Sequence, residues 1–187
     1  MEEQLAGSFK AIANKKPIEK ITIKEITDMT HIIRPAFYSY FQDKYQVLEW
    51  IVENELMLPC REKMKQGLFR QGALDFFDVM LTDSEFYQNC IRLEGQNSFR
   101  DILRESIRGA ILMLIDEETL ARLIWFRWLT TKSIADFFAE AATYAIVEWI
   151  KTGMTVPKEE IWECFMYLIT HSVEDMILGI YRDPKEV

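Results

Sequence analysis

The sequence predicts an all-α protein, with an N-terminal three-helix unit that contains a helix-turn-helix and a C-terminal helical bundle. About nine helices are expected from the apolar spacing. Glycine and proline are scarce, with 7 and 5 among 187 residues. Apolar residues recur at spacings of three and four almost throughout the chain, which is the period of an amphipathic helix. No segment alternates apolar and polar residues as a half-buried strand does.

Three helices are expected in the first part of the chain. The first carries one apolar stripe and ends at Asn14, because Pro17 follows closely. A short second helix begins after Thr22, whose side-chain oxygen can accept a hydrogen bond from a backbone N–H of the first turn. A tight turn over residues 30–32 leads into a third helix. A short helix, a tight turn and a second helix are the spacing of a helix-turn-helix.

The third helix has one face for the core and one that is free for contacts. Phe37 and Phe41 are four residues apart and therefore share a side of the helix. Arg34, Tyr38 and Ser39 fall away from that side. The sequence thus predicts a buried aromatic face opposite a polar and basic one.

The rest of the chain is expected to be helical as well. Asp43 caps a long helix that Pro59 must kink or end. We place the domain boundary inside this helix, so that the domains are residues 1–46 and 47–187. The remaining helices are expected after Gly72, after Thr82 or Asp83, and over Phe99–Ile115, Glu117–Leu129, Ile134–Ile150 and Pro157–Tyr181.

Composition excludes several classes of protein. With 49% hydrophobic and 13% aromatic residues, the chain can bury a core and is not a disordered segment. Cys60, Cys90 and Cys164 are widely spaced, which supports neither a disulfide framework nor a zinc site. The N-terminus has no basic region of a signal peptide, and no apolar run approaches the ~18 residues of a membrane span. We therefore expect a cytoplasmic protein without a membrane partner.

The net charge of −8 is unevenly distributed. Residues 1–50 contain seven Lys or Arg and seven Asp or Glu, so the whole acidic excess lies in residues 51–187. A neutral N-terminal part is less basic than phosphate binding favours. Its lysines need only cluster on one face, however, and a second copy of the chain would double the contacts.

The residue order in the N-terminal part resembles a known family. Thr22-Ile23 at a helix start, a turn that ends at Ile32, and Phe37-Tyr38-x-Tyr40-Phe41-x-Asp43-Lys44 ahead of Val47-Leu48 resemble the TetR/AcrR family of transcriptional regulators. This resemblance covers roughly the first 50 residues. Residues 141–154 and 157–160 are similar to the C-terminal domain of the family branch that includes the activator of dihydroxyacetone kinase operons. The resemblance implies a double-stranded DNA operator as a partner.

The same resemblance assigns roles to individual residues. Residues 34–36 form the first turn of the recognition helix, which meets base edges in the major groove. Tyr38 and Lys44 match positions that hold phosphate, Thr22 matches a helix start that suits a phosphate as well, and Lys24 matches a position that can reach a base. The expected DNA-binding residues are Thr22, Lys24, Arg34, Pro35, Ala36, Tyr38, Tyr40 and Lys44.

Three residues depart from the family pattern. His31 stands where the turn usually has Gly, and a left-handed backbone strains His more than Gly. Ile33 stands where Ser or Thr usually caps the recognition helix, which forfeits a cap of about 1 kcal/mol. Ala36 replaces a common Thr. These departures, with the neutral charge, motivate an alternative function: a protein-interaction adaptor on this fold with weak or lost DNA binding.

The C-terminal part is rich in aromatic residues, and regulators of this family commonly bind an apolar or amphipathic effector there. A protein coactivator is the other partner that the branch resemblance suggests. An aromatic stripe can equally be core, and His171 can equally be an ordinary core or surface histidine. The expected effector-binding residues are Trp125, Phe126, Trp128, Tyr144 and His171.

A small-residue face on the helix over residues 134–150 suggests close helix packing. It consists of Ala135, Ala139, Ala142 and Ala145. The family pairs its last two helices across a two-fold axis into a four-helix bundle, and a dimer matches two half-sites on DNA. We expect a homodimer; the alternative is close packing within one subunit.

No residue pattern suggests catalysis. His31 and His171 have no Cys, Asp or Glu partner at metal-ligand spacing, and no Ser-His-Asp or Gly-x-Ser-x-Gly arrangement occurs. We expect no enzyme, no metal site and no cofactor. The expected function is a one-component regulator whose operator binding is controlled by a ligand or protein partner at the C-terminal domain, the two binding events being coupled reciprocally.

Overall fold

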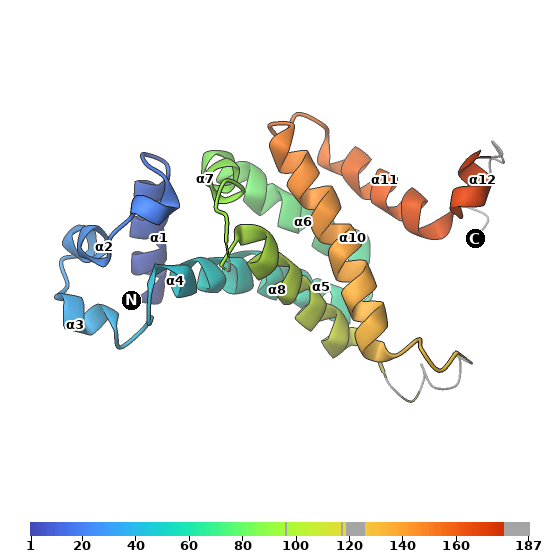
Figure 1. The fold of residues 1–187 in the computed structure, drawn as a ribbon, viewed down its shortest axis with the longest axis horizontal. Coiled ribbons are helices and arrows are strands. Elements are labelled where there is room, and N and C mark those ends of the chain that lie inside the picture. The colour runs from blue at the N-terminus through green and yellow to red at the C-terminus, as the bar shows by residue number, and fades with distance from the viewer. Residues whose placement is uncertain (96, 117, 119–125, 178–187) are drawn as a thin grey trace.

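The computed structural model describes residues 1–95, 97–116, 118 and 126–177, and every regular element among them is helical. The N-terminal end of the molecule consists of α1 (Glu2–Ala13), the 3₁₀ turn η1 (Ile18–Lys20), α2 (Ile23–Thr30) and α3 (Arg34–Phe37). These elements lie together at the left of Figure 1. The all-α fold class that the sequence predicts is confirmed.

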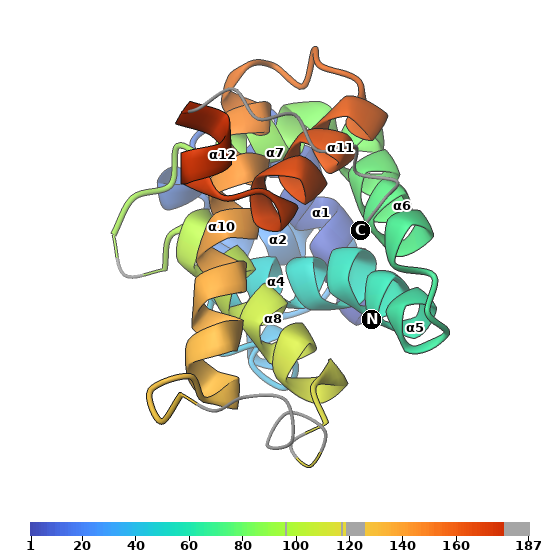
Figure 2. The ribbon, with the colours of Figure 1, turned by 90° about the vertical axis from the view of Figure 1, so that its right-hand side faces the viewer.

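The C-terminal part consists of α6 (Phe69–Thr82), α7 (Ser84–Cys90), α8 (Phe99–Leu114), α10 (Thr131–Lys151), α11 (Lys158–Thr170) and α12 (Val173–Ile177). Figures 1 and 2 show from two sides that α10 lies along α8. α11 contacts α6 and α10. One hydrophobic core runs through both parts of the molecule, from Phe9 in α1 to Trp149 in α10.

A long helix connects the two parts. It comprises α4 (Lys44–Ile51), the π-helical segment η2 (Val52–Met57) and α5 (Leu58–Lys65). Asp43 caps it as predicted, with Oδ1 accepting from the Tyr45 and Gln46 backbone N–H groups at 2.8 and 2.9 Å. Pro59 lies in the first turn of α5 and lacks an N–H. The wide turn of η2 directly before it accommodates the proline, so the helix is interrupted and not ended.

Side chains of α1 contact both the connecting helix and α7. Lys10 Nζ lies 2.7 Å from both the Glu55 carboxylate on η2 and the Asp83 carboxylate at the start of α7. Burial lowers the pKa of the Lys10 ammonium, but the hydrogen bonds to Asp83 and Glu55 raise it, with a net rise. The rings of Phe9 and Phe86 meet edge to face, with centroids 6.1 Å apart. Residues of η2 and α7 therefore converge on one side of α1.

α6 begins at Phe69, earlier than the sequence suggests, and Gly72 lies inside it. A Cβ at Gly72 would lie 3.0 Å from the carbonyl oxygen of Cys60 on α5. The glycine thus permits the close approach of α5 and α6, and it does not mark the start of the helix.

The prediction of a helix over Glu117–Leu129 is wrong for residues 126–129, which the structure describes. Residues 117 and 119–125, which include Trp125, lie outside the described residues. Phe126–Leu129 form a turn, in which the Leu129 N–H donates to the Phe126 carbonyl at 3.0 Å. A new helix, α10, begins after Thr130, whose hydroxyl accepts from the Ser133 N–H while the Ser133 hydroxyl accepts from the Thr130 N–H. This capping box starts α10 independently of the preceding segment.

The single helix predicted over Pro157–Tyr181 is also wrong, because α11 ends at Thr170. His171 is extended, with φ −114° and ψ 140°. Its Nδ1 lies 3.0 Å from both the Tyr167 carbonyl oxygen and the Thr170 hydroxyl. Such local side-chain bonds compete with helix continuation. The short helix α12 follows, and residues 178–187 lie outside the described residues.

The alanine face of α10 serves packing within the chain. Ala135 and Ala139 are fully buried, and α10 packs closely along α8. Small side chains let two helix backbones approach, which is the physical reason for the close contact. The alanine pattern therefore supports the intrachain alternative, and a dimer would have to use another surface.

Candidate nucleic-acid interface

The start of α2 is built by a capping box. The Thr22 hydroxyl accepts from the Glu25 N–H at 3.3 Å, and the Glu25 carboxylate accepts from the Thr22 N–H at 2.9 Å. The Thr22 cap is therefore confirmed. The Thr22 hydroxyl also donates to Glu25 at 2.8 Å. Because Thr22 is committed to this motif, the N–H groups of Ile23 and Lys24 are the donors of this turn that remain for a partner.

Glu25 is the centre of this small network. Lys16 Nζ lies 2.5 and 2.7 Å from its two carboxylate oxygens. The hydrogen bond from Lys16, followed by those from the Thr22 hydroxyl and N–H, lowers the pKa of Glu25 to about 2. Glu25 is thus ionised at neutral pH, and it joins the loop before η1 to the first turn of α2.

The turn between α2 and α3 has the left-handed residue that the family pattern implies. His31 has φ 56° and ψ 32°, and its N–H donates to the Thr27 carbonyl. The Ile32 N–H donates to the same carbonyl at 3.2 Å. The turn therefore forms with histidine in a conformation that strains L-residues by about 1–2 kcal/mol.

The recognition helix α3 is a single turn that ends at Phe37, so the prediction that the helix also carries Phe41 is wrong, and residues 38–40 form turns. Its buried and exposed sides are nevertheless those that the sequence predicts. Phe37 and Phe41 are buried. Ile33 makes no side-chain cap bond, as expected, and its side chain is 72% exposed. On the free face Arg34 Nη2 donates to the Tyr38 hydroxyl at 3.0 Å, and its guanidinium lies 5.7 Å from the Tyr38 ring centroid. The tyrosine thus holds the arginine at the surface.

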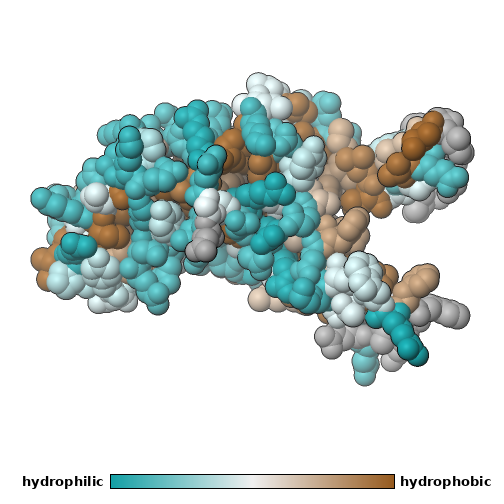
Figure 3. Space-filling model, in the orientation of Figure 1, coloured by the Kyte–Doolittle hydropathy of each residue, from teal (hydrophilic) through white to brown (hydrophobic). Residues whose placement is uncertain are grey.

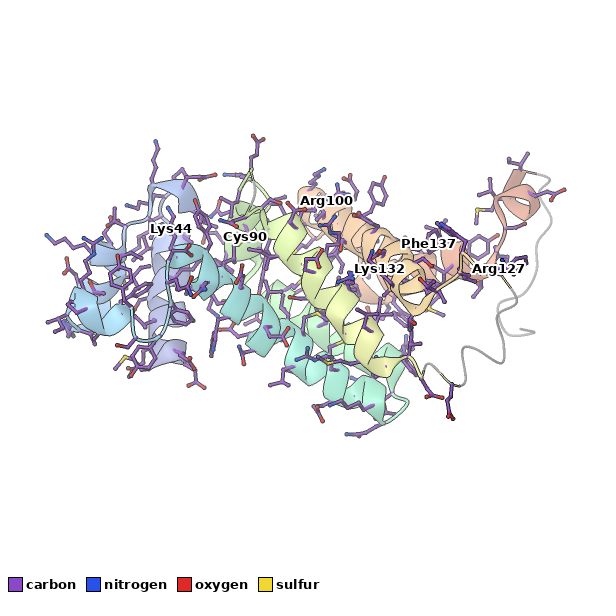
Figure 4. All side chains as sticks on the ribbon, turned by 60° about the horizontal axis from the view of Figure 1, so that its bottom comes forward. Lys44, Cys90, Arg100, Arg127, Lys132 and Phe137 are labelled. Atoms are coloured by element: carbon purple, nitrogen blue, oxygen red, sulfur yellow. The ribbon has the colours of Figure 1, made fainter. Side chains whose placement is uncertain are left out.

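Lys44 is placed differently from the other predicted contacts. Its ammonium, at the start of α4, lies against the main chain of η1 and the following residues, and burial lowers the pKa of Lys44 (Figure 4). Of the eight expected DNA-binding residues, only Lys44 and Ala36 are half-buried. The exposed ones are Thr22, Lys24, Arg34, Pro35, Tyr38 and Tyr40. They share the end of the molecule that is farthest from α11 in Figure 1.

The expected effector residues are not brought together. Trp128 and Tyr144 line an open groove of about 620 Å³ on the outer face of α10. Phe126 is 75% exposed and does not line the groove, and Trp125 lies outside the described residues. His171 is buried elsewhere, with its ring stacked on Tyr167 at a centroid distance of 4.0 Å.

The groove contains residues that the sequence did not suggest. Phe137 is 67% exposed and lies two helical turns before Tyr144 on the same face of α10. Arg100 of α8 reaches the groove and pairs with Glu140. The spacing of seven between the two aromatic residues was a readable signal, since residues two turns apart share a face. Figure 4 shows Phe137 and Arg100 on the two neighbouring helices.

Neither a cluster of metal-ligating side chains nor a membrane-spanning helix occurs in the part of the chain that the structure describes. No group of three His, Cys, Asp or Glu side chains there could hold a metal ion. None of the helices described is both long and apolar enough to cross a membrane.

Burial raises the pKa of the Cys60 thiol to about 11 and that of the Cys90 thiol well above its usual value. Both thiols are therefore protonated at neutral pH.

Comparison with known proteins identifies the family of the chain. Residues 69–171 match the family model TetR_C_8, described as "Transcriptional regulator C-terminal region". This match covers more than half of the chain. The chain belongs to the TetR family of transcriptional regulators. The TetR resemblance read from the N-terminal residues is thus confirmed from the C-terminal half.

Two curated relatives align with part of this TetR-family chain. The "Uncharacterized HTH-type transcriptional regulator YxbF" of Bacillus subtilis (strain 168) is 30% identical over 81 residues, which are 43% of this chain and 19% of that protein. The "HTH-type dhaKLM operon transcriptional activator DhaS" of Lactococcus lactis subsp. lactis (strain IL1403) is 33% identical over 51 residues, 27% of each chain. The alignments thus span about a fifth and about a quarter of these relatives.

A solved structure shares the fold over most of its length. The "Dihydroxyacetone kinase operon activator DhaS" superposes with a TM-score of 0.63 at 19% identity, covering 90% of this chain and 93% of that one. The resemblance to this branch of the TetR family is therefore confirmed in fold.

Proposed function

We propose that this TetR-family chain is a homodimeric one-component regulator, in which residues 1–46 bind an operator in double-stranded DNA. Residues 47–187 would form the dimer and receive the controlling signal. The observation that carries the proposal is the free face of α3, where Arg34 stands exposed at the first turn and is held by Tyr38. Opposite this face, Phe37 anchors the helix in the core.

The geometry of α3 suits the major groove. In a helix-turn-helix, residues of the first turn of the second helix meet base edges. An arginine there can donate two hydrogen bonds to a guanine, the commonest specific contact in protein–DNA complexes. The Tyr38 hydroxyl fixes the direction of the Arg34 guanidinium before binding. Less side-chain freedom is then lost on binding, which supports affinity.

The surface that supports a dimer is formed by α10 and α11. None of the 13 residues of α11 is buried, although most are apolar. Leu168 of α11 and Phe137 and Tyr144 of α10 are 60–67% exposed. Figure 3 shows hydrophobic residues gathered over this side of the molecule. Contiguous exposed apolar surface of this kind marks interaction sites, and a second copy related by a two-fold axis would cover it.

Control would act through the C-terminal part, at the groove that Trp128, Phe137 and Tyr144 line. Small-ligand pockets usually bury most of their ligand. The groove is open to solvent, and its shape therefore favours a protein partner over a small apolar effector. The name of the relative DhaS describes a transcriptional activator, which supports control of transcription here without indicating its sign.

Operator binding is tested by gel-shift titration of a duplex from the region upstream of the gene and a random duplex of equal length, at several salt concentrations. The wild type should prefer the upstream duplex, and affinity should fall with salt. Arg34→Ala should relax this preference by roughly 1–3 kcal/mol, the usual value of a base contact. Arg70→Ala, an exposed arginine of the C-terminal part, is the matched control.

Equal and weak binding of the wild type to both duplexes would contradict the proposal and favour the adaptor function. Control at the groove is measured in the same assay with cell extract or amphipathic compounds added. These should change the affinity of the wild type and not that of Trp128→Ala.

A further inference from the structure

The ammonium of Lys44 is enclosed by main-chain carbonyls of the segment that precedes α2. Nζ lies 2.8 Å from the carbonyl oxygen of Ile18, 2.5 Å from that of Glu19 and 3.0 Å from that of Ile21. A lysine ammonium has three N–H donors, so these contacts use all of them. Figure 4 shows Lys44 at the start of α4, beside the N-terminal helices.

The Ile21 carbonyl in particular needs such a donor. The Ile18 carbonyl, at the start of η1, also accepts from the Ile21 N–H at 3.1 Å, whereas the Glu19 and Ile21 carbonyls accept from Lys44. Ile18 and Ile21 are 1% and 3% exposed, so their surroundings are largely closed to water. A buried acceptor that loses its only donor is unfavourable. Moving Lys44 outward to a phosphate would leave the Ile21 carbonyl in that condition, while the Ile18 carbonyl would keep the Ile21 N–H and the exposed Glu19 carbonyl could bind water.

The three bonds connect two helix starts. Lys44 is the first residue of α4, and Ile21 directly precedes Thr22, the cap of α2. The bonds therefore fix the first turn of α2 against the first turn of α4. The first turn of α2 keeps the Ile23 and Lys24 N–H groups for a partner, and its position against α4 decides whether they face the same DNA as Arg34.

We propose that Lys44 is a positioning residue of the DNA interface, which holds the first turns of α2 and α4 at a fixed separation and does not itself bind a phosphate. This inference rests on the proposed function. Of the basic residues among the expected contacts, Lys24 and Arg34 are exposed and would remain to meet DNA.

The test compares wild type, Lys44→Met, Lys44→Arg and the control Lys65→Met in titrations of the upstream duplex over a range of salt. Lys65 is an exposed lysine of α5 and changes the net charge equally. Each lysine on a phosphate adds about 0.9 to the slope of log association constant against log salt concentration. Melting curves first establish a temperature at which every variant is folded.

A positioning role gives Lys44→Met about tenfold weaker binding, the size of one lost hydrogen bond to a charged group, with the salt slope of the wild type. Lys44→Arg should fail to restore binding, because a planar guanidinium cannot place three donors around one point. Lys65→Met should bind like the wild type. If Lys44→Met does not fold, the test relies on Lys44→Arg, whose affinity and salt slope are compared with those of the wild type.

Two results would overturn the inference while leaving DNA binding intact. A slope that becomes shallower by about 0.9 per subunit in Lys44→Met, with full binding by Lys44→Arg, would make Lys44 a phosphate contact. Unchanged affinity of a folded Lys44→Met would make its role purely structural. Absence of salt-dependent binding by the wild type would instead defeat the proposed function, and the positioning role with it.

Discussion

At the scale of single residues, the candidate interface depends on side chains that bind the backbone of their own domain. Glu25 shows the pattern. It closes the capping box at Thr22 and accepts from Lys16, whose Nζ lies 2.5 Å away. The first turn of α2 is thereby fixed from two sides, before any contact with a partner.

Replacing Glu25 with Gln should reveal a pH-dependent contribution to stability. The folded-state pKa of Glu25 is lowered to about 2 from an ordinary value of 4.5. A carboxyl with a lowered folded pKa stabilises the fold fully above its unfolded pKa, and this stabilisation is lost as pH falls through the folded value. The urea midpoint of the wild type should therefore exceed that of Glu25→Gln at pH 7, and the difference should shrink between pH 4.5 and 2.

Glu94→Gln, at an exposed position outside this network, is the control for acid effects elsewhere. A difference between wild type and Glu25→Gln that stays constant down to pH 2 would contradict the assignment.

At the scale of elements, the turn between α2 and α3 is held in a strained conformation. His31 has a positive φ of 56° and an exposed side chain, so few contacts depend on its imidazole. A left-handed L-residue is strained by about 1–2 kcal/mol, whereas glycine adopts this region freely. The turn therefore stores strain that glycine would remove.

His31→Gly should raise the melting temperature. The relief of about 1–2 kcal/mol exceeds the roughly 0.5–1 kcal/mol by which glycine's freedom favours the unfolded chain. The net gain is at most about 1.5 kcal/mol, and each kcal/mol should raise the melting temperature of a chain of this length by roughly 2–4 °C. His31→Ala keeps the Cβ and should give no gain. A lower melting temperature for His31→Gly than for His31→Ala would refute the explanation.

The elements also show what the sequence could and could not predict. The caps at Thr22 and Asp43 and the buried face of Phe37 were predictable, because each depends on residues within one or two turns. The starts and ends near Thr130 and His171 were missed, since the apolar spacing continues across both and only hydrogen bonds interrupt it.

The candidate site, too, was predictable only where its residues lie close together in the sequence. Arg34 and Tyr38 were placed correctly on an exposed face, because they are four residues apart on one helix. The surroundings of Lys44 depend on carbonyls 23 to 26 residues away in the sequence, so no local pattern could indicate them. The groove could not be foreseen as a whole, because Arg100 reaches it from a different helix.

At the scale of the whole molecule, the two ends differ in the kind of side chain that they expose. The end with α2 and α3 presents polar and aromatic side chains around a single turn of helix. The side with α10 and α11 presents an apolar surface that no part of the described chain covers (Figure 3). The proposed dimer would give this surface a partner, and operator binding would require its two copies of α3 to lie about 34 Å apart, one turn of DNA.

Leu168→Glu should convert the dimer into a monomer. Leu168 is 60% exposed in the single chain, so a glutamate is tolerated there, whereas a dimer would bury one unpaired charge from each subunit. Light scattering should show the mass falling from two chains to one at micromolar concentration. Leu68→Glu changes an exposed leucine outside this surface and should remain dimeric. A dimeric Leu168→Glu, or a monomeric wild type, would place the interface elsewhere.

The contacts around α1 have a consequence for cooperativity. A fragment that ended at residue 46 would lack both Glu55 and Asp83, the two carboxylates that hold Lys10, and would uncover Phe9 where Phe86 now packs. The proposed boundary near residue 46 would therefore separate roles and not folding units. Whatever stabilises the folded C-terminal helices against unfolding also raises the fraction of chains whose N-terminal helices are intact, by mass action alone. Proteases that degrade unfolded chains would then act on the same equilibrium, between folded and unfolded chains, that limits how many chains can bind the operator.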